Sequence, residues 1–256
     1  MKRSSSQPFS HGPFRADQLR AGDPYELSHG HPVRCLPTGG RGAKATSFGA
    51  GVLASDPAAR DVGVDTGFSP APDVLRAPDI AVGEIPDQPG WVQGVPLLAV
   101  EYADTGQDEA ELAAKIDDLF AAGTRCIWVV RLTGPRRVEI HQPGKNVSVA
   151  HPGEELTAPG ILANPVPVKA LYEGEAARTV VLRNLLQRQG YANLEAVKAE
   201  SLQQATCEVL AARGFAVDDA FRAALAGEGN LEILTTVLRR AATASSTAEI
   251  LAALQS

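Results

Sequence analysis

Hydrophobic and polar positions divide the chain into a first part with strand-like runs and a second part with helical periods. As far as His141, short apolar runs rich in β-branched residues are separated by Gly and Pro, which is typical of strands. The predicted strands cover residues 25–27, 32–36, 62–66, 79–82, 96–102, 126–130 and 137–141. After Tyr172, apolar residues recur at helical spacing between glycine breaks. The helices predicted there cover residues 176–189, 194–212, 218–226, 231–242 and 247–254.

The order of elements in the middle of the chain predicts the topology of a sheet. An amphipathic helix over residues 108–121 lies between the strands 96–102 and 126–130, and this order predicts a parallel pair joined by a right-handed crossover. The turn after Thr133 then leads into residues 137–141 as an antiparallel neighbour. The pattern therefore predicts an α/β fold, with a mixed β-sheet flanked by helices and followed by a C-terminal all-α extension.

Shifts in composition predict three segments. Residues 1–14 are rich in Ser, Pro and Gly without a hydrophobic period, so we expect a flexible tail. The strand-rich part, residues 15–172, forms the predicted first domain. Residues 173–256 form the predicted helical C-terminal module, whose apolar stripes favour packing or self-association over ligand binding.

The charge of the chain limits the partners that it can attract. Its 24 basic and 30 acidic residues give a net charge of -6, so the chain as a whole does not attract a polyanion. A nucleic-acid interface must then come from local basic groups, although solvated surface charge explains these groups equally well. The candidates are Arg34, Arg41, Lys44, Arg136 and Arg137. No apolar run reaches the ~18 residues of a membrane span, so we expect a cytoplasmic protein without a membrane partner.

Two carboxylates placed beside apolar strands are the candidate chemistry. Asp79 precedes the run Ile80-Ala81-Val82, and Glu101 closes an almost wholly apolar strand. Two such carboxylates can share one Mg²⁺ ion, which takes oxygen ligands and keeps several waters, and Mn²⁺ is the other candidate. Lys115, on the following helix, can point its ammonium at the same strand ends.

Ordinary structural roles explain each of these residues as well. Asp79 behind a proline can cap a turn, and Glu101 can pair with a buried arginine. Lys115 follows Glu111 by one helical turn, which allows an ordinary i,i+4 pair. Asp73 ends a second Ala-Pro-Asp string and is the fallback for Asp79, which we prefer because it opens an apolar run.

The motifs of residues 15–172, taken in order, resemble a known family. They are Tyr25-Glu26-Leu27 with Gly30 and Val33, Pro78-Asp79-Ile80-Ala81-Val82, Val100-Glu101, Lys115, Ala122-Gly123 and Ile127-Trp128-Val129-Val130. This order resembles the Uma-type restriction endonucleases within the PD-(D/E)XK nuclease superfamily. The resemblance implies a restriction-endonuclease-like mixed β-sheet flanked by helices. Each motif is short, so their order carries the resemblance.

The resemblance also implies roles for four residues. Asp79 and Glu101 would be the metal-binding pair, Lys115 the active-site lysine on the helix, and Glu26 a further acidic group from the hairpin that the strands 25–27 and 32–36 are predicted to form. The residue two positions beyond Glu101 is Ala103, so Lys115 is the residue that can supply the lysine.

Two functions follow as hypotheses from different classes. The first is a metal-dependent endonuclease that hydrolyses DNA phosphodiester bonds with Mg²⁺ or Mn²⁺. The second is a catalytically inactive protein of the same fold that serves in protein interaction or assembly. In either case the C-terminal helices can make a homo-oligomer, which would give a nuclease two active sites for two strands.

Overall fold

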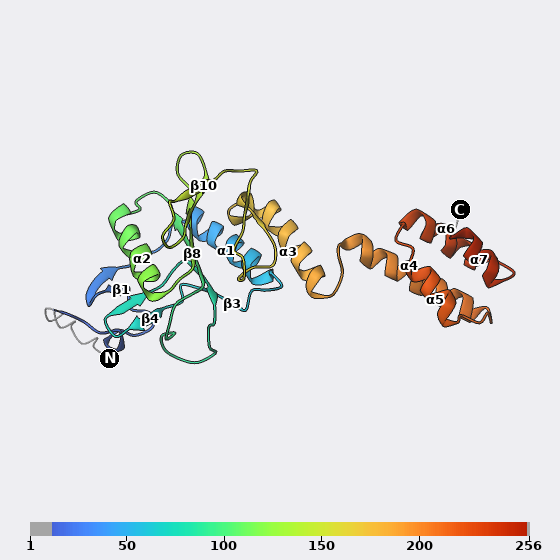
Figure 1. Cartoon of the computed structure of the whole chain (residues 1–256), viewed down its shortest axis with the longest axis horizontal. Helices are drawn as coiled ribbons and strands as arrows, with labels where there is room; N and C mark the ends of the chain where they lie inside the picture. The colour runs from blue at the N-terminus through green and yellow to red at the C-terminus, as the bar shows by residue number, and fades with distance from the viewer. Residues whose placement is uncertain (1–11, 255–256) are drawn as a thin grey trace, which may run out of the picture. The chain divides into compact units, whose positions relative to one another are not determined.

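The structure of the chain is a computed structural model that describes residues 12–254 (Figure 1). Most of the predicted tail, residues 1–11, lies outside the described residues. Phe14 already belongs to the folded part, because its N–H donates to the carbonyl of Gly30 at 2.8 Å. The chain divides into two compact units after Asn184. Within residues 12–254, no helix is long and apolar enough to cross a bilayer.

The first unit is built on a mixed six-stranded sheet with the strand order β10-β9-β8-β7-β6-β3. Its strands are β3 (Asp61–Val64), β6 (Ile80–Gly83), β7 (Leu98–Ala103), β8 (Cys126–Arg131), β9 (Arg137–His141) and β10 (Ser148–Ala150). β7 and β8 are parallel and are connected by a helix. β6 pairs antiparallel with β7, and β9 pairs antiparallel with β8. The predicted mixed sheet is therefore confirmed, including its parallel pair and the antiparallel strand that follows.

A second sheet has four strands in the order β2-β1-β5-β4. They are β1 (Tyr25–Ser28), β2 (His31–Arg34), β4 (Phe68–Ala71) and β5 (Val74–Arg76). The predicted hairpin of β1 and β2 turns through His29 and Gly30, whose φ angles of 47° and 76° suit a tight two-residue turn. The hydrophobic pattern of the sequence does not predict β4 and β5. A two-stranded sheet of β11 (Glu155–Leu156) and β12 (Val166–Pro167) completes the unit.

Two helices cover opposite faces of the six-stranded sheet (Figure 1). They are α1 (Gly40–Ser55) and α2 (Glu109–Ala122). The unit also contains two short 3₁₀ helices, η1 (Ala16–Gln18) and η2 (Val168–Leu171). Strand alternation divides β7 between the faces, since Val100 packs in the core under α1 and Ala99 in the core under α2. Asp108 caps the start of α2 by accepting two backbone N–H groups, and Gly123 ends it at a φ of 114°.

The boundary between the units falls inside α3 (Gly174–Arg188). Ala177 and Val180 of this helix are buried in the core of the first unit. Asn184 is buried there as well and donates to the hydroxyl of Ser55 at 3.0 Å. The first unit therefore extends about three helical turns beyond Tyr172, the last residue of the part of the chain in which the family resemblance was found.

The second unit consists of helices around a core of its own. They are α4 (Leu194–Ala212), α5 (Asp219–Ala226), α6 (Leu231–Ala241) and α7 (Thr247–Ala253). Each begins at an Asn, Asp or Ser whose side chain accepts a backbone N–H, which explains where the helices start. The core includes Leu210, Phe221, Leu234 and Ile250. The predicted C-terminal all-α extension is confirmed.

Candidate active site

Asp79, directly before β6, lies opposite Glu101 of the neighbouring strand β7. Ile80 pairs with Val100 across β6 and β7, so the next position of this antiparallel register brings Asp79 opposite Glu101. Residues opposite each other share a face, and Glu101 lies between Ala99 and Ala103, which both pack under α2. The backbone N–H of Tyr102 donates to Asp79 Oδ2 at 2.6 Å and fixes that carboxylate. The β-ladder therefore places both carboxylates on the face covered by α2.

Lys115 reaches the same face from α2. Its Nζ lies 2.9 Å from Glu101 Oε1 and 3.1 Å from Glu26 Oε1, and it donates to the carbonyl of Ala77 at 2.7 Å. The side chain is 13% exposed, so the ammonium is held by these contacts rather than by water. The i,i+4 alternative with Glu111 is thus not the arrangement found. Of the four predicted residues, Glu26, Glu101 and Lys115 are in direct contact, with Asp79 opposite Glu101.

Burial controls the protonation of this cluster. It raises the pKa of Glu101 to about 8, with the neighbouring Asp79 adding to the shift. Burial also raises the pKa of Asp79. For Lys115, burial acts to lower the pKa, but the charges of Glu101 and Glu26 outweigh it and raise the pKa above its ordinary value. The ammonium therefore stays charged, while burial favours the protonated form of Glu101 more than water does.

The carboxyl of Glu101 has the chemistry of a ligand for a divalent cation. Its Oε1 is buried and lies 2.9 Å from the ammonium of Lys115. Carboxylate oxygens beside a second carboxylate suit Mg²⁺ or Mn²⁺, which fill their other positions with water. No cluster of three or more His, Cys, Asp or Glu side chains with metal-binding geometry occurs in residues 12–254. The pair Asp79 and Glu101 is compatible with Mg²⁺, which keeps several waters as its other ligands.

A second set of buried charges adjoins the first. Arg76, at the end of β5, lies 3.2 Å from Glu26 and bonds to Asp118 through Nε and Nη2 at 2.8 and 2.6 Å. Asp118 follows Lys115 by three positions on α2, which places both on one side of the helix. Sequence reasoning missed this pair. The sequence features that could have pointed to the pair are the position of Arg76, two residues before Pro78, and the position of Asp118, one helical turn after Lys115.

The predicted DNA-binding residues lie on separate elements and most have partners. Arg41 at the start of α1 donates from Nε to Asp104 at 2.9 Å, and Arg137 donates to Glu139 at 2.9 Å. Lys44 lies over the ring of Phe48, and Arg136 over that of Tyr172. Arg34 is exposed on β2. The residues Arg41, Arg136 and Arg137 share the end of the sheet where β7 and β8 finish.

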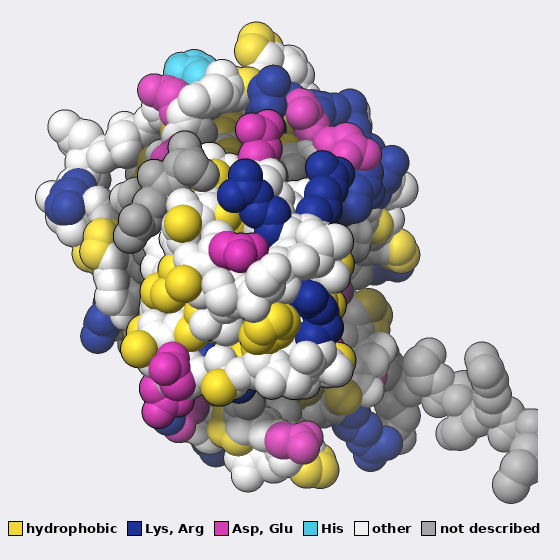
Figure 2. Space-filling model, turned by 90° about the vertical axis from the view of Figure 1, so that its right-hand side faces the viewer, with side chains coloured by type: hydrophobic (Ala, Val, Ile, Leu, Met, Phe, Trp, Pro, Cys, Tyr) yellow, Lys and Arg dark blue, Asp and Glu magenta, His cyan; other side chains and the backbone are white. Residues whose placement is uncertain are grey.

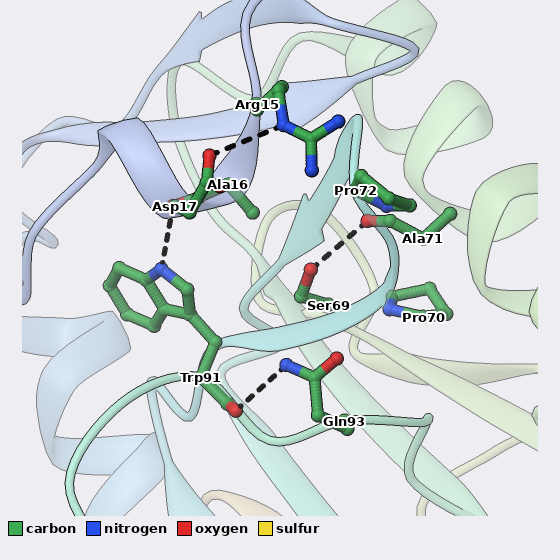
Figure 3. A pocket seen from close by; sticks show the side chains of 9 residues that line it. All are labelled: Arg15, Ala16, Asp17, Ser69, Pro70, Ala71, Pro72, Trp91 and Gln93. Carbon is green, nitrogen blue, oxygen red and sulfur yellow. Dashed lines mark hydrogen bonds and ion pairs between the residues drawn. The ribbon is translucent and has the colours of Figure 1, made fainter.

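The face that Figure 2 shows and one surface cavity give no independent indication of a binding site. Acidic and basic side chains are intermixed on the face that Figure 2 shows. The cavity, with a volume of about 270 Å³, is lined by residues in and next to η1 and β4, such as Arg15 and Pro72, and by Trp91 and Gln93 (Figure 3). None of the four predicted active-site residues lines it. The candidate site therefore rests on the buried cluster and not on a cavity.

Comparison with solved structures shows a shared fold. The first unit is similar to the crystal structure of a putative nuclease belonging to DUF820 from Anabaena variabilis ATCC 29413, with a TM-score of 0.54 and 19% sequence identity. The match covers 64% of this chain and 99% of the other. Comparison with curated proteins finds no significant match to this chain.

The chain belongs to the Uma2 family, described as putative restriction endonucleases, whose model matches residues 14–166. The resemblance drawn from the motifs is thereby confirmed. The matched residues include Glu26, Asp79, Glu101 and Lys115, and they end before α3 and the helices of the second unit.

Proposed function

We propose that the first unit is a metal-dependent endonuclease that hydrolyses phosphodiester bonds of DNA. The observation that carries the proposal is the buried cluster of Asp79, Glu101 and Lys115 in a member of a restriction endonuclease family. Two carboxylates on rigid neighbouring strands and one ammonium between helix and sheet are the groups that phosphoryl transfer requires.

Each side chain has a distinct task in this proposal. Asp79 and Glu101 hold Mg²⁺ or Mn²⁺, and such a cation supplies a more acidic bound water and a counter-charge for the phosphate. Lys115 keeps its proton and offsets the negative charge that develops on the phosphate oxygens. Glu26 holds the ammonium in place through the 3.1 Å contact. The Tyr102 N–H keeps Asp79 oriented toward the same face.

The substrate and its contacts extend the proposal. Arg41, Arg136 and Arg137 lie at the end of the sheet that carries Glu101, and we propose that they meet the phosphate backbone there, with Lys44 and Arg34 as further candidates. Since Arg41 and Arg137 are paired with acids, DNA would have to compete with these pairs. This predicts weak binding with a strong dependence on salt.

The first experiment measures metal binding and cleavage together. Calorimetric titration of Mn²⁺ and Mg²⁺ is combined with cleavage of plasmid and short duplex DNA. Glu101→Gln and Asp79→Asn should each lower cleavage about 100-fold or more and weaken metal binding. Asp73→Asn is the matched control, because Asp73 ends the other Ala-Pro-Asp string in the turn between β4 and β5.

Two results would reject the proposal. Wild-type protein that neither binds the metals nor cleaves DNA would favour the inactive interaction protein instead. Cleavage that survives in both Glu101→Gln and Asp79→Asn would place the active site elsewhere. A predicted homo-oligomer is tested separately by sedimentation of the full chain.

A further inference from the structure

Arg76 is a buried cation without a task in the proposed reaction. Its side chain is 2% exposed and lies between the carboxylates of Glu26 and Asp118. Burying a guanidinium away from water is unfavourable unless its partners are well placed, so the surrounding structure must be organised to hold it. Three of its nitrogens are used: Nη1 toward Glu26, and Nε and Nη2 toward Asp118.

Glu26 joins Arg76 to the candidate active site. Its Oε2 lies 3.2 Å from Arg76 Nη1, and its Oε1 lies 3.1 Å from Lys115 Nζ. The two oxygens of one carboxylate are therefore fixed by two different cations. A carboxylate held at one oxygen can turn about its last torsion, whereas one held at both cannot.

Asp118 fixes the other side of the guanidinium. Besides Arg76, it accepts the hydroxyl of Ser28 at 2.8 Å and lies 3.2 Å from His29 Nε2. Ser28 and His29 belong to the same hairpin as Glu26, while Asp118 belongs to the same helix as Lys115. Arg76 thus connects the hairpin with α2 by ion pairs on both sides.

We propose that Arg76 is a positioning residue, which fixes Glu26 so that Glu26 holds the ammonium of Lys115 beside Glu101. The consequence for catalysis rests on the proposed nuclease function. The positioning itself is a property of the metal-free chain and can be measured without any substrate. An arginine that serves stability alone would not influence Lys115 through Glu26.

The test variant is Arg76→Lys, which keeps the charge but cannot hold two carboxylates in a planar fork. Its matched control is Arg131→Lys, because Arg131 also joins two acids, Glu109 and Glu139, but lies outside the cluster. The measurement is the rate at which an amine-acylating reagent labels Lys115 in the metal-free protein, read by peptide mass spectrometry.

Labelling of Lys115 should rise about fivefold or more in Arg76→Lys and stay unchanged in Arg131→Lys. In a Glu26→Gln background, Arg76→Lys should add nothing, since the coupling runs through Glu26. Asp118→Asn, which keeps the shape and weakens the hold on Arg76, serves if Arg76→Lys does not fold. Equal labelling in the Arg76 and Arg131 variants, or additive effects of Arg76→Lys and Glu26→Gln, would overturn the proposal.

A second readout connects the positioning with catalysis. In Arg76→Lys, kcat for Mn²⁺-dependent DNA cleavage should fall about tenfold, while KM and the calorimetric Kd for Mn²⁺ stay within about twofold. A weaker Mn²⁺ affinity would contradict a role through Lys115. Absence of cleavage in the wild type would reject the nuclease function, and the labelling result would still decide the positioning role.

Discussion

The two faces of the six-stranded sheet are built from the same strands but by different chemistry. Under α1, the large side chains Val100, Tyr102 and Trp128 pack into an apolar core. Under α2, small residues such as Ala99 leave room for Glu101 and the ammonium that approaches it. Apolar burial stabilises the fold directly, whereas buried ion pairs contribute little net stability. One face therefore supplies the stability that allows the other to hold charges.

The largest effect is expected on the apolar face. Trp128→Ala removes a side chain with no exposed surface and should lower the free energy of unfolding by about 3–5 kcal/mol, because a cavity remains. Urea denaturation measures the loss. Trp91→Ala is the control, since the half-buried Trp91 lies at the cavity of Figure 3 and should lose clearly less. Equal losses would remove the distinction between a stabilising core and the rest of the unit.

Removing the ammonium from the charged face should have the next largest effect. Lys115→Met leaves Glu101 buried without its cation and Glu26 with Arg76 alone, and should cost about 3 kcal/mol. Adding Glu101→Gln removes the unpaired acid and should restore part of the loss. Thermal melts of the single and double variants measure this coupling. Strict additivity of the two changes would mean that Lys115 and Glu101 do not interact.

The charged face also predicts a dependence of stability on pH. The folded-state pKa of Glu101, about 8, lies above the ordinary value of 4.5, so the folded protein binds a proton that the unfolded chain has released. The contribution of Glu101 to the free energy of unfolding is largest below pH 4.5. It falls as the pH rises toward 8, by roughly 2 kcal/mol between pH 6 and 8. Denaturation of metal-free wild type and Glu101→Gln across this range should show the slope in the wild type and its reduction in the variant. A slope of the same size in both would assign it to another group.

The smallest effect is expected at the exposed end of the sheet. Arg41→Ala breaks the pair with Asp104 and should change stability little, because the arginine is exposed and water screens the pair. If Arg41 contacts a phosphate, DNA affinity should fall and the slope of log affinity against log salt should drop by about one. Arg60→Ala, at an exposed pair with Glu84, is the control. Equal loss of DNA affinity in both variants would argue against a specific contact at Arg41.

Periodicity was enough to predict the long elements of this fold. The strands β7 and β8 and the helix between them have continuous apolar patterns, and their parallel pairing follows from their order. The strand β4 was missed because Pro70 interrupts it, and β5 because it has only three residues. Runs this short show no period, and their pairing depends on partners distant in sequence.

The candidate site could be predicted where a charge interrupts an apolar run. Glu101 stood out for this reason, while the resemblance supplied Glu26 and the assignment of Lys115. Asp118 does not interrupt an apolar strand, and an acid on a helix normally faces water, so the sequence did not indicate its pairing with Arg76. Their pairing depends on how α2 is placed over β1 and β5, which is a property of the tertiary structure.

The ion pairs of the cluster join residues that are distant along the chain, and this has a consequence for the order of folding. Ser28 and Asp118, which bond directly, are separated by 90 positions, and Arg76 is 42 positions from Asp118. Contacts of such long sequence separation form slowly because loop closure precedes them. During synthesis, the hairpin, Asp79 and Glu101 leave the ribosome before α2 does. A nascent chain therefore carries both candidate metal ligands before it has the lysine that completes the site.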